Sequence, residues 1–90
     1  MTVHDWDSFV GALRGIVIEA ASKLPASDIT AIWESIEGGE PGIAFEDLCT
    51  QMQEYEIHVD EETRKVLSEI EAYTGSAPQL WLHLKPELDE

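Results

Sequence analysis

The sequence is poor in cysteine and in long apolar runs. It has one cysteine, Cys49, in 90 residues, whereas extracellular domains this small are usually held together by several disulfides. The longest aliphatic run, residues 16–18, ends at Glu19, far short of the ~20 apolar residues of a membrane helix. Residues 1–7 lack the basic and apolar regions of a signal peptide. We therefore expect a protein of the reducing cytoplasm that does not enter a membrane.

Basic residues are also scarce. Five lysines and arginines stand against nineteen aspartates and glutamates, so the formal net charge is −14. From Asp28 to Thr63 there is no lysine or arginine at all. A charge of this size repels nucleic-acid phosphates and anionic lipids, and it raises the encounter rate with a basic partner. The composition argues against direct binding of nucleic acid and is compatible with a basic protein partner.

Hydrophobic residues make up 43% of the chain and charged residues 27%. This is too apolar for the low-hydrophobicity, high-charge regime of disordered chains. A chain of this length has room for one small domain with a single core. We expect residues 1–90 to form one helical domain.

The spacing of apolar residues predicts a compact all-α bundle of about four short helices. They are expected over residues 7–24, 28–37, 41–55 and 60–74, with an irregular tail over 76–90. Leu80-Trp81-Leu82-His83-Leu84 lies between two prolines of this tail and fits either an extended segment or one helical turn.

The ends of the first two helices carry recognisable signals. Asp7 or Ser8 can cap the first helix. Pro25 bars its continuation, because the residue before a proline avoids the α region. Ser27 is the expected cap of the second helix, and Gly38 is expected to close it in the left-handed conformation.

The last two helices are marked in the same way. Pro41 suits the first position of the third helix. Asp60 offers a cap for the fourth helix, and Gly75 is placed to end it.

Aromatic residues and the cysteine are expected to serve packing. Trp33 and Cys49 fall beside apolar stripes and are predicted to lie in the core. Tyr73 is expected on the buried face of the fourth helix. Trp6 and Trp81 are predicted to clamp the chain ends onto the bundle, the alternative being that they offer contact area to a partner.

No pattern indicates catalysis. The candidate bases His4, His58 and His83 are scattered along the chain and belong to no catalytic signature. The sequence also lacks a calcium loop, a pair of cysteines and a His-Glu-x-x-His motif. We expect no enzyme activity, no metal and no cofactor.

The stretch from Ile32 to Ile70 resembles the MafI-like immunity proteins of bacterial polymorphic toxin and contact-dependent inhibition systems. The resemblance is carried by Trp33-Glu-Ser-Ile36, Gly39-Glu40, Gly42-Ile-Ala44-Phe-Glu46-Asp-Leu48-Cys49, Gln53-Glu54-Tyr55 and Asp60-Glu-Glu62. It covers about half of the chain. It implies a small helical protein that binds the C-terminal effector domain of a toxin, often a nuclease, and blocks it.

This resemblance and the charge together suggest a mechanism of occlusion. Carboxylates would pair with the lysines and arginines of the toxin that otherwise hold phosphates, while Tyr55 supplies buried contact area. The alternative is an acidic face that only keeps the protein soluble. The candidate partner-binding residues are Glu37, Glu40, Glu46, Asp47, Glu54, Tyr55, Glu56, Asp60, Glu61 and Glu62.

Two other functions remain open at this stage. An acyl-carrier-like protein is also small, acidic and helical, but it needs an Asp-Ser-Leu site, and Ser27-Asp28-Ile29 has the order reversed. A regulatory or adaptor module for another partner fits the same composition. On its own the protein is expected to be a monomer or a weak dimer.

Overall fold

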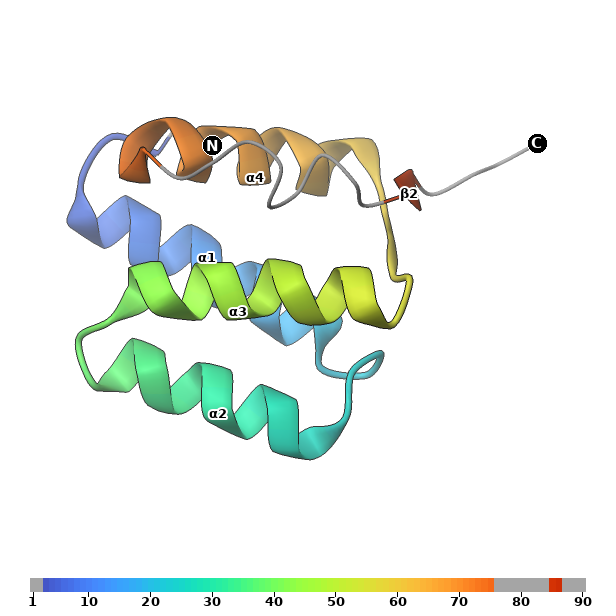
Figure 1. The fold of residues 1–90 in the computed structure, drawn as a ribbon. Coiled ribbons are helices and arrows are strands. Elements are labelled where there is room, and N and C mark those ends of the chain that lie inside the picture. Colours follow the sequence, from blue (N-terminus) through green and yellow to red (C-terminus); the bar gives the residue numbers. More distant parts are fainter. Residues whose placement is uncertain (1–2, 76–84, 87–90) are drawn as a thin grey trace.

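The computed structural model describes residues 3–75 and 85–86. In this part of the chain four helices follow one another: α1 (Trp6–Ala20), α2 (Ala26–Glu37), α3 (Pro41–Glu54) and α4 (Glu61–Thr74). Successive helices run in opposite directions (Figure 1). Helix α2 packs along α3, and α1 packs against α2, α3 and α4. None of the four is long and apolar enough to cross a membrane. The predicted all-α bundle is confirmed.

The first helix is capped by Asp5, and not by Asp7 or Ser8 as predicted. The carboxylate of Asp5 accepts a hydrogen bond from the Ser8 backbone N–H at 2.8 Å, and the Ser8 hydroxyl accepts one from the Asp5 N–H at 3.1 Å. This reciprocal capping box satisfies two backbone donors at once, which a single side chain at either predicted position would not do. The hydrogen bond from the Ser8 backbone lowers the pKa of Asp5.

The first helix also ends earlier than predicted, at Ala20 instead of residue 24. The Lys23 N–H donates to the Ala20 carbonyl at 2.9 Å, and the Ala21 N–H donates to Ile18 at 3.3 Å. These bonds span three residues, so the chain tightens into a turn before it reaches Pro25. Pro25 restricts only residue 24, so the earlier end coincides with this tightening and not with the proline.

The second helix begins at Ala26, two residues before the predicted start, and Ser27 is not its cap. The backbone carbonyl of Pro25 accepts hydrogen bonds from the N–H groups of Asp28 and Ile29 at 3.0 and 3.1 Å. Proline has a fixed φ and already occupies the capping position, so no side-chain cap forms. Ser27 therefore lies within the first turn.

The turn between α2 and α3 uses its two glycines in the opposite order to the prediction. Gly38 keeps a negative φ of −81° and donates to the Glu34 carbonyl at 2.9 Å. Gly39 takes the left-handed conformation, with φ of +85°. Helical hydrogen bonding therefore continues to Gly38, and the chain changes direction at Gly39. The predicted place of Pro41 at the first position of α3 is confirmed.

The ends of α4 agree with the prediction. The Asp60 carboxylate accepts a hydrogen bond from the Thr63 backbone N–H at 2.7 Å, so Asp60 is the cap. Gly75 has φ of +74° and ends the helix in the left-handed conformation. Tyr55, expected inside the third helix, is its C-cap residue, and α3 ends at Glu54.

A short backbone pairing joins the α3–α4 link to the C-terminal region. Strand β1 (His58–Val59) pairs in parallel with β2 (Lys85–Pro86), and each has two residues. The remaining tail predictions, including those for Trp81 and His83, lie outside the described residues. The alternative between an extended segment and a helical turn for residues 80–84 is among them.

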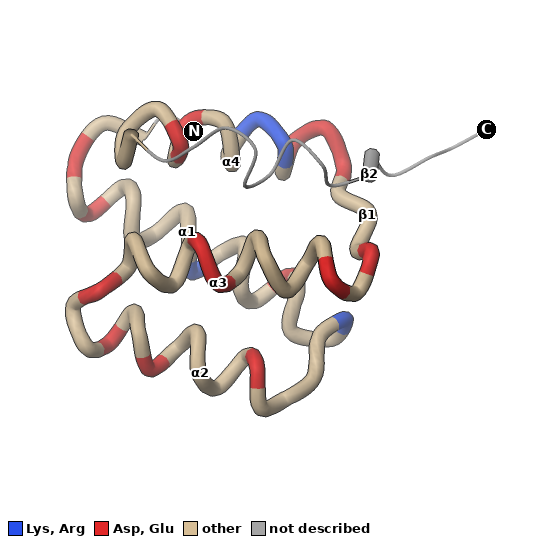
Figure 2. The backbone as a smooth tube through the Cα atoms, viewed as in Figure 1, with Lys and Arg blue, Asp and Glu red and all other residues tan. Residues whose placement is uncertain are grey.

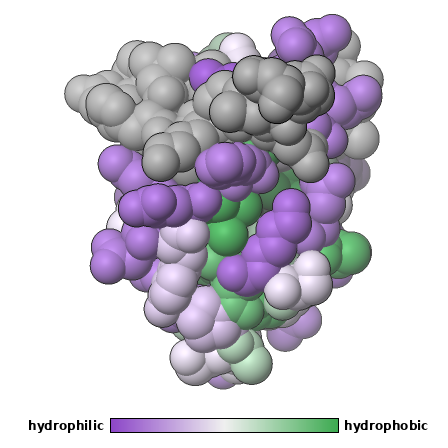
Figure 3. All heavy atoms as spheres, turned by 90° about the vertical axis from the view of Figure 1, so that its right-hand side faces the viewer, coloured by the Kyte–Doolittle hydropathy of each residue, from purple (hydrophilic) through white to green (hydrophobic). Residues whose placement is uncertain are grey.

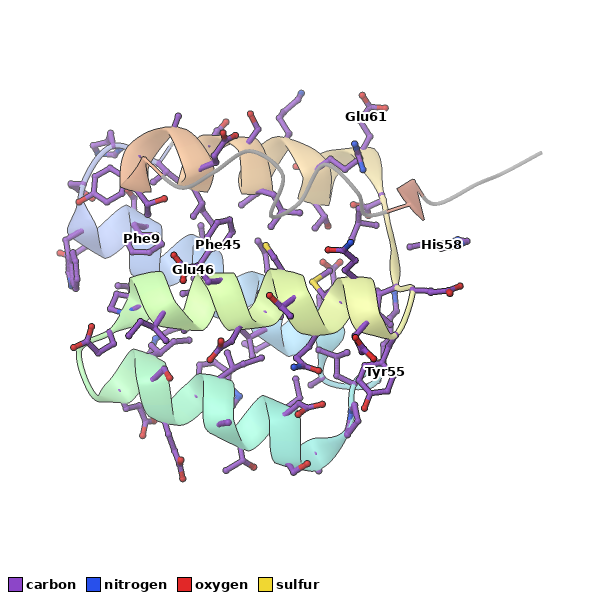
Figure 4. All side chains as sticks on the ribbon, viewed as in Figure 1. Phe9, Phe45, Glu46, Tyr55, His58 and Glu61 are labelled. Atoms are coloured by element: carbon purple, nitrogen blue, oxygen red, sulfur yellow. The ribbon has the colours of Figure 1, made fainter. Side chains whose placement is uncertain are left out.

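The core lies where α1 and α3 face each other and where α2 and α4 close over them. Its fully buried side chains include Leu13 and Val17 from α1, Phe45, Leu48 and Cys49 from α3, and Leu67 and Ile70 from α4. Phe9 and Phe45 extend this core toward the start of α1 (Figure 4). The predicted burial of Cys49 is confirmed, and desolvation raises the pKa of its thiol to about 12.

Three aromatic side chains lie at the margin of the core. Trp33 is half-buried, with the Arg14 guanidinium 5.7 Å from the centre of its ring, so the prediction of a core position is only partly right. Tyr73 remains 39% exposed, although its ring lies 5.4 Å from that of Phe9. Trp6 also contacts Phe9, edge to face at 5.9 Å, and belongs to α1 itself.

Candidate functional site

The structure divides the ten candidate residues among three places (Figure 2). Glu37 and Glu40 lie at the α2–α3 turn, and Glu46 and Asp47 are exposed in the middle of α3. The other six form what we call the acidic end, around the link from α3 to α4: Glu54, Tyr55, Glu56, Asp60, Glu61 and Glu62. Helix α3 is about 21 Å long at ~1.5 Å per residue. The length of α3 therefore separates Glu37 and Glu40 from the acidic end.

The backbone turn after α3 brings the acidic end together. The Ile57 N–H donates to the Met52 carbonyl at 2.8 Å, which folds the chain back under the last turn of the helix. Glu56 has φ of +53°, the left-handed conformation that a non-glycine residue adopts at some cost. Tyr55 is left 48% exposed beside it. Figure 4 shows His58 and Glu61 pointing away from the bundle at this end.

Asp60 ties the acidic end to α1 through its neighbour Thr63. The hydrogen bonds from Thr63 lower the pKa of the Asp60 carboxyl, and Lys23 contributes a smaller effect of the same sign. The Thr63 hydroxyl donates to a carboxylate oxygen of Glu19 at 3.2 Å. Asp60 is thus held as a carboxylate, and Glu19 of α1 joins the same cluster.

A shallow cleft opens at this end of the bundle. Figure 3 shows hydrophobic surface exposed there between hydrophilic side chains. The cleft has a volume of about 30 Å³. Its apolar lining residues are Ile16, Ala20, Met52, Ile57 and Val59, and its polar ones are Glu19, Lys23, His58, Asp60 and Thr63.

A larger groove continues from the cleft along the seam between α1 and α4. We call it the α1–α4 groove, and its volume is about 190 Å³. Cleft and groove share Ile16, Glu19, Asp60 and Thr63, so they form one continuous depression. The described residues that line the groove are Gly11, Ala12, Gly15, Ile16, Glu19, Asp60, Glu62, Thr63 and Val66.

Among the residues that the structure describes, the cysteine and the histidines do not meet in a site. Cys49 is fully buried, and burial raises its thiol pKa to about 12, so it carries little nucleophilic thiolate at neutral pH. His4 and His58 are exposed on different parts of the surface. Among the described residues, no group of three or more histidine, cysteine and acidic side chains could hold a metal ion.

Sequence reasoning missed the contribution of α1 to this surface. Gly11, Gly15 and Glu19 are spaced four residues apart and so share one face of a helix. That spacing is visible in the sequence. The prediction treated α1 only as a source of core residues, whereas this second face lines the groove.

Comparison of the chain with protein-family models, with curated proteins and with solved structures found no match. The resemblance of the stretch from Ile32 to Ile70 to MafI-like immunity proteins therefore remains one of sequence pattern.

Proposed function

We propose that this protein is an inhibitory binding partner of the immunity-protein kind. It holds a basic effector domain of a toxin against its acidic end and so covers the surface by which that domain binds its substrate. The observation that carries the proposal is the acidic end itself. There, Glu54, Glu56, Glu61 and Glu62 are exposed beside the half-exposed Tyr55.

The charges of this end favour binding over mere solubility. Within the described residues, Glu54, Glu61 and Glu62 form no ion pair with a lysine or arginine. Their field is therefore directed to solvent, where it can steer a cationic surface into contact. Such steering raises association rates from about 10⁵–10⁶ toward 10⁸–10⁹ M⁻¹s⁻¹ at low salt. A protein that has to block a toxin soon after meeting it needs a high association rate.

Apolar contact area lies next to these charges. Tyr55 belongs to the residue types that dominate binding energy in protein interfaces. The cleft at this end of the bundle is lined by Ile57 and Val59 at the edge of the core. An interface with an apolar centre and a charged rim has the usual anatomy of a stable complex.

The test is a binding measurement with the toxin effector domain encoded beside this chain. Glu54→Lys, Glu61→Lys and Glu62→Lys are combined in one variant. A matched control carries Glu34→Lys, Glu37→Lys and Glu40→Lys at the opposite end of α3, and therefore has the same net charge. Circular dichroism confirms that both variants fold. Affinity and its salt dependence are then measured by calorimetry, together with rescue of growth when the effector is co-expressed.

We expect the acidic-end variant to lose about 100-fold or more in affinity at low salt and to lose protection of growth. The control should lose less than about tenfold, because only long-range steering changes. Equal losses in the two variants would show that affinity depends on the net charge of the protein and not on the acidic end. Full binding by the acidic-end variant, or no binding by the unaltered protein, would refute the proposal.

A further inference from the structure

The α1–α4 groove combines an apolar floor with an acidic rim. Ile16, Val66 and Ala12 supply the floor. Glu19, Asp60 and Glu62 supply three carboxylates, and no lysine or arginine is among the described residues that line the groove. The groove thus offers both parts of a protein-binding surface, apolar area and charge of one sign.

Two glycines keep this groove open. A Cβ atom placed on Gly11 or Gly15 would meet no other atom within 4 Å. The packing of the described chain therefore does not require either glycine, although glycine inside a helix costs about 0.5–1 kcal/mol relative to alanine. What the glycines provide is space along one face of α1. Ile18, one turn beyond Gly15, is 66% exposed at the edge of that face.

We propose that the α1–α4 groove receives a basic amphipathic helix of the partner protein. Its apolar side chains enter the groove over Gly11 and Gly15, and its lysines or arginines reach Glu19, Asp60 and Glu62. This inference rests on the proposed function, because it names the form of the partner segment. It enlarges the proposed binding surface from the acidic end to a continuous surface that also includes α1.

The negative charge of the groove determines which class of molecule can bind there. A second copy of this chain would bring another formal charge of −14 to an acidic rim, so self-association through the groove is opposed. Nucleic acid and anionic lipid are repelled for the same reason. Asp60 is ionised in neutral solution, and hydrogen bonds from Thr63 lower its pKa further. A cationic protein segment complements the groove.

The geometry of the floor favours a helix over an extended strand. From Gly11 to Glu19 the groove follows about 12 Å of α1, at ~1.5 Å per residue, which is about two helical turns. Gly11 and Gly15 are four residues apart and belong to one ridge of the helix surface. Removing side chains from such a ridge leaves a channel into which the corresponding ridge of a facing helix can pack.

The experiment uses a synthetic peptide as the probe, so it does not depend on finding the toxin. The peptide has about 18 residues of leucine and lysine, with the leucines on one helical face. A second peptide has the same composition in scrambled order. Each is titrated into isotope-labelled protein, and chemical-shift changes are mapped by NMR. The variants are Gly15→Leu, which fills the groove, and Gly42→Leu as the control, since its Cβ also meets open space.

We expect the amphipathic peptide to shift the amides of Gly11, Gly15, Thr63 and Val66 most strongly. Gly15→Leu should weaken its binding by about tenfold or more, while Gly42→Leu binds like the unaltered protein. The scrambled peptide should bind at least about tenfold more weakly. The inference is overturned if Gly15→Leu binds as tightly as the control, or if the shifts are spread evenly over all acidic residues.

The two proposals fail in different ways. If Gly15→Leu still binds the toxin effector domain fully while the acidic-end reversals abolish that binding, the groove is not used and the proposed function stands. If the peptide occupies the groove but the acidic-end reversals leave effector binding unchanged, the proposed function is wrong and the groove keeps its affinity for basic helices.

Discussion

Helix α1 meets its neighbours along two seams that are built differently. Toward the core it presents Leu13 and Val17, both fully buried. Toward α4 it presents Gly11 and Gly15, and a groove of about 190 Å³ remains there. One seam is filled by branched side chains that are fully buried, and the other is left open by residues that have no side chain.

The difference separates the residues that hold the fold from those available to a partner. Leu48 of α3, which is fully buried, cannot contact another protein without unfolding. Gly11 and Gly15 can be changed with little loss of packing, because a Cβ atom at either position would meet no other atom of the described chain. Adding a side chain at these glycines should therefore change stability in the opposite direction to truncating a buried side chain of the core.

The largest effect is expected at the closed seam. Leu48→Ala removes a fully buried side chain and leaves a cavity, so it should lower the free energy of unfolding by about 2–5 kcal/mol. Val66→Ala at the groove removes a partly buried side chain and should cost about 1 kcal/mol. Urea denaturation followed by circular dichroism measures both. Equal losses would mean that the two seams are packed alike.

A smaller effect is expected at the junction between the groove and the acidic end. Asp60→Ala removes the cap of α4 and should lower the free energy of unfolding by about 1 kcal/mol at neutral pH. Asp60→Asn is the matched control, because an asparagine side chain also caps helices well. If Asp60→Ala were as stable as the control, the hydrogen bond to the Thr63 N–H would contribute nothing.

The contribution of Asp60 should depend on pH. Its pKa in the folded protein lies below its ordinary value, because the hydrogen bonds from Thr63 favour the carboxylate. A carboxyl group with a lowered folded pKa stabilises the protein above its unfolded pKa, and this contribution is lost as the pH falls through the folded value. The stability difference between the unaltered protein and Asp60→Ala should therefore be constant from pH 7 to about 5 and decrease below about 4. A difference that grows on acidification would contradict this assignment.

The fold was predictable because its signals are local. Apolar spacing places the four helices, and Pro41, Asp60 and Gly75 mark ends that the structure confirms. The errors arise where two signals compete within a few residues. Asp5 rather than Asp7 caps α1, because Asp5 and Ser8 each accept a hydrogen bond from the backbone N–H of the other. Gly39 rather than Gly38 reverses the chain because backbone bonding of α2 continues one residue further.

The candidate surface was predictable only in part. The acids from Glu54 to Glu62 are close in sequence, and a single turn gathers them, so their grouping follows from local structure. Glu37 and Glu40 are just as acidic, but the length of α3 separates them from that group. The contribution of Glu19 depends on how α1 packs against α4, through the hydroxyl of Thr63. Such a contact between residues far apart in the chain has no signature in one sequence.

The smallest effect has the opposite sign and tests the open seam most directly. Gly15→Ala should raise the free energy of unfolding by about 0.5–1 kcal/mol, because alanine is the better helix former and its Cβ meets open space. Gly39→Ala is the contrast, since the positive φ of Gly39 makes any side chain there strained, and it should be destabilising. Thermal unfolding of both variants beside the unaltered protein gives the comparison. A loss of stability in Gly15→Ala would show that the chain itself needs the space above this glycine, and the groove would then belong to the fold and not to a partner.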